Sequence, residues 1–167
     1  MSSKSSDGAA EPPVAPCPHH PPRACAAPAA LTILVVDDNR HMRRLLLEVL
    51  GNEFRGSSIL EAADGREALA QCLQATPDIV VMDIGLPDAD GIELTSTVRL
   101  LFPQTAVVVL SSHEGSAYRD AACHAGAASY VAKVDVATAL IPAISAALHP
   151  RARRAEPDDH TGRNAAP

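Results

Sequence analysis

The 167-residue sequence contains no tryptophan, and aromatic residues make up only 2% of it. Because 47% of the residues are hydrophobic, an ordinary fraction for a globular protein, its core must be aliphatic. No apolar run approaches the roughly 20 residues that a membrane-spanning helix needs. The opening MSSKSSDGAAEPP also lacks the apolar segment of a secretory signal. We therefore expect a cytoplasmic protein that does not associate with membranes.

Cysteine is also scarce, and the four present are Cys17, Cys25, Cys72 and Cys123. This number is too low for a disulfide scaffold, so we expect free thiols. Cys17 and Cys25 flank His19 and His20, but their spacing is not that of a standard zinc finger and three prolines interrupt the run. Glycine-rich phosphate loops of the GxGxxG or GxxxxGKS type are absent from the sequence.

Positive charge is sparse in the middle of the chain. Residues 30–149 include eight Lys or Arg and fifteen Asp or Glu. Binding to a nucleic-acid backbone requires clustered cationic side chains that displace counterions. The small cluster of Arg151, Arg153 and Arg154 is offset by acidic neighbours. We therefore expect no direct binding to DNA.

Proline and hydrophobic periodicity divide the chain into three parts. Seven of the 14 prolines precede residue 29, in a segment rich in alanine and without apolar periodicity. We expect residues 1–29 and 150–167 to be disordered tails. The remaining residues, 30–149, have the length of one ordinary domain.

Five short apolar or β-branched runs alternate with segments of helical periodicity. The predicted strands are Leu31–Val36, Ser57–Glu61, Asp78–Met82, Thr105–Leu110 and Ala128–Ala132. The first predicted helix begins near Arg40. The other four cover Gly65–Ala75, Gly91–Leu101, Ser116–Ala125 and approximately Ala137–Leu148. This alternation predicts an α/β fold, a doubly wound five-stranded parallel sheet with helices on both faces.

Pro142 conflicts with the last predicted helix, because proline inside a helix loses a hydrogen bond and clashes with the preceding turn. Either the regular helix starts late, near Ala139, or it is kinked at the proline. The sequence leaves both alternatives open.

Polar side chains follow four of the predicted strands. Asp37 and Asp38 follow the first strand, Asp83 the third, Ser111 the fourth and Lys133 the fifth. In an open parallel sheet, ligands bind beyond the carboxyl ends of the strands, so these side chains should lie near one another. Three carboxylates at one edge repel each other unless a cation joins them. Oxygen ligands of this kind favour Mg²⁺.

Each of these residues also has a simpler interpretation when taken alone. Asp38 or Asn39 can cap the helix that follows the first strand. Lys133 can be solvated, and Ser111 can belong to a turn. The combination favours a common site, because four separate strand ends would otherwise have acquired compatible chemistry by chance.

The sequence resembles the response-regulator receiver domains of two-component signalling. The resemblance covers about residues 30–149 and rests on ILVVDDNRHMRRLL, DIVVMDIGLPDADGIEL, VVVLSSHEG and GAASYVAKVD. Its sharpest part is MDIGLPDADG. It implies a flavodoxin-like fold and a phosphoacceptor at Asp83, with Asp37 and Asp38 organising Mg²⁺. It also implies that the backbone carbonyl of Gly85 contacts the metal.

The resemblance further implies roles for three residues on the last two strands. Ser111 would meet the phosphoryl group through its hydroxyl, Lys133 would be its cationic partner, and Tyr130 would be the aromatic switch. The phosphoryl donor would be phosphohistidine on a histidine kinase or a histidine phosphotransfer protein. The only catalysis expected is the protein's own phosphorylation and dephosphorylation, which would switch an interaction surface read by an unidentified downstream protein.

One departure concerns Val134, which stands where many receivers have proline. The segment GAASYVAKVD is similar to the receivers usually joined to a helix-turn-helix effector, and about 18 polar residues follow the domain here. We therefore expect a stand-alone receiver that signals through another protein. An alternative is a receiver-fold interaction module that works without phosphorylation. A metal-dependent hydrolase is disfavoured, since such an enzyme usually needs Asp-x-Asp where this chain has Asp37-Asp38-Asn39.

Overall fold

The computed structural model describes residues 30–113 and 115–148. The two predicted tails lie outside the described residues. In chain order the elements are β1 (Thr32–Val36), α1 (Arg40–Glu53), β2 (Ser58–Ala62), α2 (Gly65–Ala75), β3 (Ile79–Asp83), α3 (Gly91–Leu101), β4 (Ala106–Ser111), α4 (Ser116–His124), β5 (Ser129–Ala132), the short 3₁₀ helix η1 (Lys133–Asp135) and α5 (Val136–Leu148).

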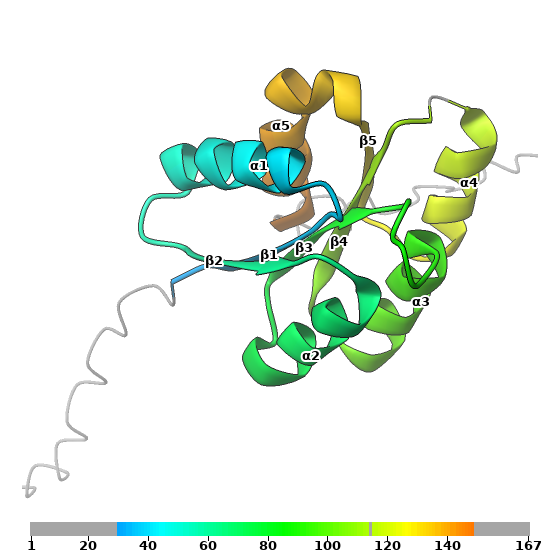
Figure 1. The fold of residues 1–167 in the computed structure, drawn as a ribbon, viewed down its shortest axis with the longest axis horizontal. Helices are drawn as coiled ribbons and strands as arrows, with labels where there is room; N and C mark the ends of the chain where they lie inside the picture. Colours follow the sequence, from blue (N-terminus) through cyan, green and yellow to red (C-terminus); the bar gives the residue numbers. More distant parts are fainter. Residues whose placement is uncertain (1–29, 114, 149–167) are drawn as a thin grey trace, which may run out of the picture.

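The strands form one parallel sheet in the order β2-β1-β3-β4-β5. Helices α1 and α5 cover one face, and α2, α3 and α4 cover the other (Figure 1). The predicted doubly wound α/β fold is therefore confirmed. Among the described residues, no helix combines the length and apolar character needed to cross a membrane.

The sheet separates two aliphatic core layers because successive strand residues point to opposite faces. In β1, Ile33 and Val35 pack with α1 and α5, whereas Leu34 and Val36 pack with α2 and α3. The central strand β3 is buried along its whole length. Burial on both faces explains why its sequence is a continuous apolar run.

The predicted element positions are confirmed with small shifts. Each strand begins one residue later than predicted, and β3 and β4 extend to the polar residues Asp83 and Ser111. The length of an apolar run does not indicate where such a strand ends, because strands pair through hydrogen bonds between backbone groups, which polar residues also have. Helix α5 begins at Val136 and continues through Pro142, so the late start near Ala139 is wrong.

Two of the four cysteines lie within the described residues, and both are free thiols. Cys72 is buried on α2, where burial raises its pKa to about 11, and Cys123 is exposed on α4. Cys17, Cys25 and the two neighbouring histidines lie outside the described residues.

Candidate functional site

The site lies at the topological switch point of the sheet, where the strand order changes direction. From β1 the chain first adds β2 on one side and then β3 on the other. Such a switch point leaves a crevice beyond the carboxyl ends of the two central strands. Asp37 directly follows β1, and Asp83 is the last residue of β3. The topology thus places the two carboxylates at the crevice.

Three carboxylates converge there. Asp37, Asp38 and Asp83 each offer an oxygen, and these oxygens all lie within 4.8 Å of one another. Asp37 and Asp83 are buried, whereas Asp38 is exposed. Asn39, not Asp38, caps α1 by accepting hydrogen bonds from the backbone N–H groups of His41 and Met42. The carboxylate of Asp38 is therefore available to a cation.

Lys133 connects the buried carboxylates. Its Nζ lies 2.8 Å from Asp37 Oδ2 and 2.8 Å from Asp83 Oδ2. Burial alone would lower the pKa of Lys133, but the two carboxylates outweigh it and raise the pKa above its ordinary value. The lysine is therefore positively charged at neutral pH.

The environment of Asp37 suits an additional cation. Burial raises its pKa above the ordinary value and Asp83 adds to this effect, while Lys133 and the N–H of Asn39 act in the opposite direction. Asp37 Oδ2 is buried and is paired with the Lys133 ammonium, while Oδ1 accepts the N–H of Asn39. A set of three converging carboxylate oxygens, two of them from buried residues, fits a hard cation such as Mg²⁺.

A tight loop between β3 and α3 continues the site. Gly85 forms a single β-bridge with Asp90, and the Gly91 N–H donates to the carbonyl of Ile84. A Cβ atom at Gly91 would lie 2.0 Å from the backbone oxygen of Asp83. Glycine is therefore required where α3 starts, because any side chain would displace the end of β3.

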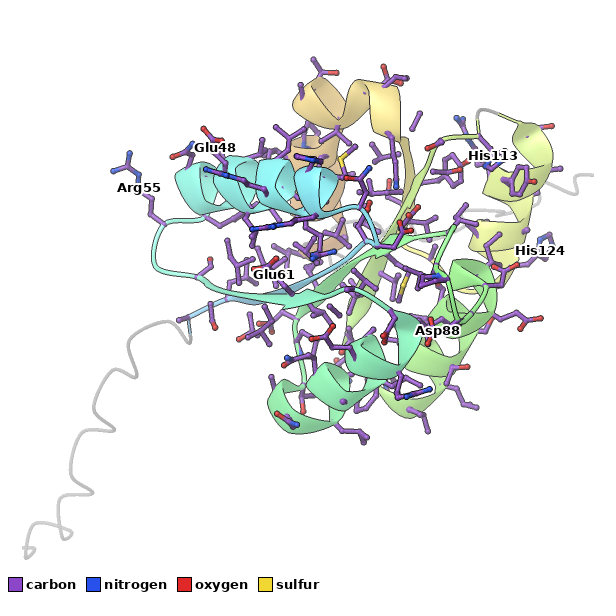
Figure 2. The ribbon with its side chains drawn as sticks, in the orientation of Figure 1. Glu48, Arg55, Glu61, Asp88, His113 and His124 are labelled. Atoms are coloured by element: carbon purple, nitrogen blue, oxygen red, sulfur yellow. The ribbon has the colours of Figure 1, made fainter. Side chains whose placement is uncertain are left out.

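Asp88 ties this loop to the beginning of α2. Its carboxylate accepts the N–H groups of Gly65 at 2.8 Å and Arg66 at 3.1 Å. Asp64 takes the next N–H of the first turn, that of Glu67. Figure 2 shows Asp88 at this end of α2. The first three N–H groups of the helix, which lack partners within it, are thus all satisfied by carboxylates.

We expect the stabilising effect of Asp88 to depend on pH. The backbone hydrogen bond from Gly65, followed by that from Arg66, lowers the pKa of Asp88. Its contribution is therefore present above the ordinary aspartate pKa of about 3.9 and is lost as the pH falls through the lower value of the folded state. Asp88→Asn should unfold at lower urea than wild type at pH 7, and the difference should shrink at acid pH. An unchanging difference would contradict this, and Asp120→Asn on α4 is the control.

A cavity of about 280 Å³ opens beside the carboxylates. The residues that line it include Asp38, Asp83, Gly85, Ser111, His113 and Lys133. Ser111 is buried at the end of β4, and its Oγ accepts the N–H of His113 at 2.9 Å. The cavity thus contains acidic, cationic and hydroxyl groups, a combination that can bind a phosphoryl group together with a metal ion.

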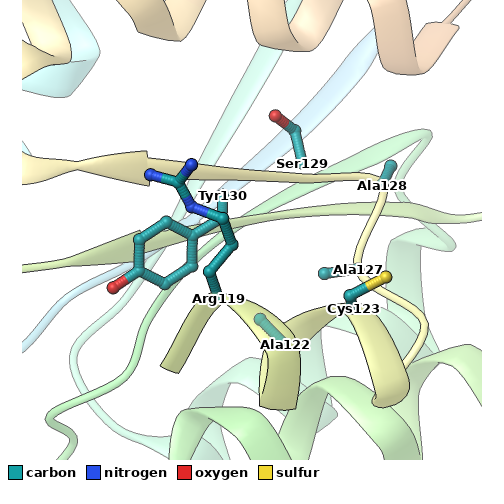
Figure 3. A pocket seen from close by; sticks show the side chains of 7 residues that line it. All are labelled: Arg119, Ala122, Cys123, Ala127, Ala128, Ser129 and Tyr130. Carbon is teal, nitrogen blue, oxygen red and sulfur yellow. The ribbon is translucent and has the colours of Figure 1, made fainter. Parts of the chain in front are cut away.

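Tyr130 does not line this cavity. It lines a second cavity of about 320 Å³ between α4 and β5, together with Arg119 and Cys123 (Figure 3). Its hydroxyl donates to the backbone carbonyl of His113, and Cζ of Arg119 lies 5.6 Å from the centre of its ring. Tyr130 is therefore linked to Ser111 through the backbone of the β4–α4 loop.

A parallel five-stranded sheet with an acidic, lysine-containing site at its switch point defines a class of α/β domains. The response regulator receiver domain model matches residues 33–145. The chain belongs to this family.

Similar proteins agree with this assignment. Response regulator MprA of Mycolicibacterium vanbaalenii is 37% identical over 134 residues, which are 80% of this chain and 55% of MprA. Chemotaxis protein CheY of Halobacterium salinarum is 35% identical, covering 71% of this chain and 98% of CheY. The structure of a LuxR-family two-component response regulator from Aurantimonas matches with a TM-score of 0.68 and 35% identity, covering 74% of this chain and 88% of that one. The chain spans about half the length of several curated relatives, including MprA.

Three residues at the site were not found from the sequence: Arg43, Asp88 and Gly91. Gly91 has a local signal, since it directly follows the helix-capping residue Asp90. Asp88 has none, because its partners lie 22–23 positions away along the chain, and such contacts exist only once the sheet is assembled. Arg43 donates to carbonyls five and six positions before it, but no periodicity or motif marks these contacts.

Proposed function

We propose that this receiver accepts a phosphoryl group on Asp83 in a reaction that depends on Mg²⁺. The observation that carries the proposal is the convergence of Asp83, Lys133 and two further carboxylates beside one open cavity. Asp37, Asp38, Asp83 and the carbonyl of Gly85 would hold the metal, and this set follows the residues that the family pattern indicates.

The chain's own residues would carry the transfer as follows. An oxygen of Asp83 attacks phosphorus, a new O–P bond forms, and the N–P bond of the donor phosphohistidine breaks with its electron pair remaining on the imidazole. Mg²⁺ held by these residues would neutralise negative charge on the phosphoryl oxygens. Lys133 stabilises the charge that develops on the transferred group, and Ser111 offers it a hydroxyl. Hydrolysis of the acyl phosphate by water resets the protein.

The proposed switch runs from Ser111 to Tyr130. The Ser111 hydroxyl accepts the His113 N–H, and the His113 carbonyl accepts the Tyr130 hydroxyl. If Ser111 turns toward a phosphoryl group, the loop changes its position and Tyr130 must follow. The surface formed by α4, β5 and α5 would then differ between the two states, and a downstream protein would read the difference.

The partners follow from this chemistry. The donor would be a histidine kinase or a histidine phosphotransfer protein in the cytoplasm, and the reader would be a protein and not DNA. Catalysis would be limited to the receiver's own phosphorylation and dephosphorylation.

Incubating the purified protein with Mg²⁺ and acetyl phosphate tests the proposal. A phosphorylatable switch gains the mass of one phosphoryl group and loses it again with time. An interaction module that works without phosphorylation gains none, and a hydrolase consumes the donor without retaining the group. The last two outcomes would overturn the proposal.

A further inference from the structure

Arg43 is a partly buried arginine on α1 that the proposed reaction does not use. Its side chain is only 16% exposed. Nη1 donates to the backbone carbonyl of Asp37 at 2.7 Å and to that of Asp38 at 3.3 Å. Nε lies 3.4 Å from Oε2 of Glu61, on β2 near α1 (Figure 2). One guanidinium thus joins the helix, the neighbouring strand and the backbone of both acidic residues.

These contacts matter most for Asp38. Its exposed carboxylate forms no hydrogen bond or ion pair with the residues that the structure describes, whereas that of Asp37 is held by Asn39 and Lys133. The direction of the Asp38 side chain therefore depends on its backbone. The two carbonyls that Arg43 binds belong to the peptide groups on either side of the Asp38 Cα. Fixing both groups fixes that residue's backbone dihedral angles and the direction of its Cβ.

We infer that Arg43 is a positioning residue that aims the Asp37 and Asp38 carboxylates at a shared divalent cation. The inference rests on the proposed function and deepens it. A guanidinium suits the role, because its rigid planar group can bind several acceptors at once in a fixed geometry. A lysine has one ammonium on a flexible stem and cannot reproduce the arrangement.

The sign of the effect separates positioning from simple electrostatics. Arg43 carries positive charge, so removing it would strengthen the binding of a cation if charge alone mattered. Loss of positioning would instead weaken the binding of the cation. The exposed neighbour Arg44 on the same helix provides a matched control, because Arg44→Met removes the same charge without touching the Asp37 or Asp38 carbonyls.

The experiment measures Mg²⁺ affinity calorimetrically for the full chain and its variants. We expect Arg43→Met to weaken Mg²⁺ binding by about tenfold, the lower end of the effect usually seen when a supporting contact of a metal ligand is lost. Arg43→Lys should bind with intermediate affinity. Arg44→Met should bind as tightly as wild type or more tightly, and Glu61→Gln should resemble wild type because the carbonyl contacts remain.

A second measurement follows the rate of phosphorylation by acetyl phosphate against Mg²⁺ concentration. Positioning predicts that Arg43→Met needs more Mg²⁺ for half-saturation and reaches the wild-type rate at saturation. A merely structural role would lower stability in urea without moving the half-saturation point.

Unchanged Mg²⁺ affinity in Arg43→Met, with wild type still phosphorylated, would overturn the inference and leave the proposed function standing. If Arg43→Met fails to fold, wild-type affinity in Arg43→Lys overturns it equally. Failure of wild type to bind Mg²⁺ and accept a phosphoryl group would instead overturn the proposed function.

Discussion

Asp83→Asn is expected to abolish phosphoryl transfer while leaving the fold intact. The substitution keeps the shape of the side chain at the end of β3 but removes the nucleophilic carboxylate, which is also one of the three carboxylates that could bind the metal. An amide oxygen is a far weaker nucleophile, and neither Asp37 nor Asp38 can replace it by the proposed mechanism. Intact mass after treatment with Mg²⁺ and acetyl phosphate should show a phosphoryl adduct on wild type and none on the variant.

The control for Asp83→Asn is Asp120→Asn, which makes the same chemical change on the exposed face of α4. It should be phosphorylated like wild type. Circular dichroism of all three proteins should be the same, so that loss of the adduct reports chemistry and not folding. A phosphoryl adduct that survives in Asp83→Asn would contradict the assignment of the acceptor.

Lys133→Met is expected to have the largest effect on stability. The Lys133 side chain is only 14% exposed, and its ammonium lies between two buried carboxylates. Removing it leaves these carboxylates facing each other, so in Mg²⁺-free buffer the free energy of unfolding should fall by about 3 kcal/mol, the lower end for a broken buried ion pair. Urea unfolding followed by circular dichroism is the suitable measurement, since the chain has no tryptophan.

The same variant should react slowly even when it is folded. Loss of one preorganised positive group beside a developing negative charge usually costs about 10²-fold in rate, so Lys133→Met with saturating Mg²⁺ should gain its adduct correspondingly more slowly. Arg44→Met, which removes an exposed positive charge, should change neither property. Wild-type stability and rate in Lys133→Met would show that the lysine is a solvated surface group.

The sequence was sufficient to predict the fold because the determinants of this fold are local and repeated. Buried strands are visible in the sequence as apolar runs, and amphipathic helices as apolar residues with helical periodicity. Their alternation implies parallel strands joined by helical crossover connections. Strand ends were harder to place, since Asp83 and Ser111 join the ladder through their backbones while their side chains are polar. Local sequence rules also could not predict that α5 continues through Pro142. The packing of Leu140 and Ile144 in the core outweighs the local cost of a proline in the helix.

The site was predictable to a different degree. The residues that chemistry needs stand at strand ends, so topology alone predicts that Asp37, Asp83 and Lys133 lie close together. The contacts that orient them were not predictable. Arg43 binds backbone carbonyls in the connection before its own helix, and Asp88 binds N–H groups at the start of α2. No periodicity or motif in the sequence indicates which side chain will bind which carbonyl or N–H group.

We propose that the three carboxylates hold one divalent ion and thereby make Asp83 a phosphoacceptor. A crystal structure of the protein with Mn²⁺ and beryllofluoride tests it most directly, because manganese is located by its anomalous signal. We expect manganese to be bound by Asp37, Asp38, Asp83 and the Gly85 carbonyl. Beryllofluoride should lie on the Asp83 carboxylate, in contact with Ser111 and Lys133. Manganese bound elsewhere, or an Asp83 without beryllofluoride, would contradict it.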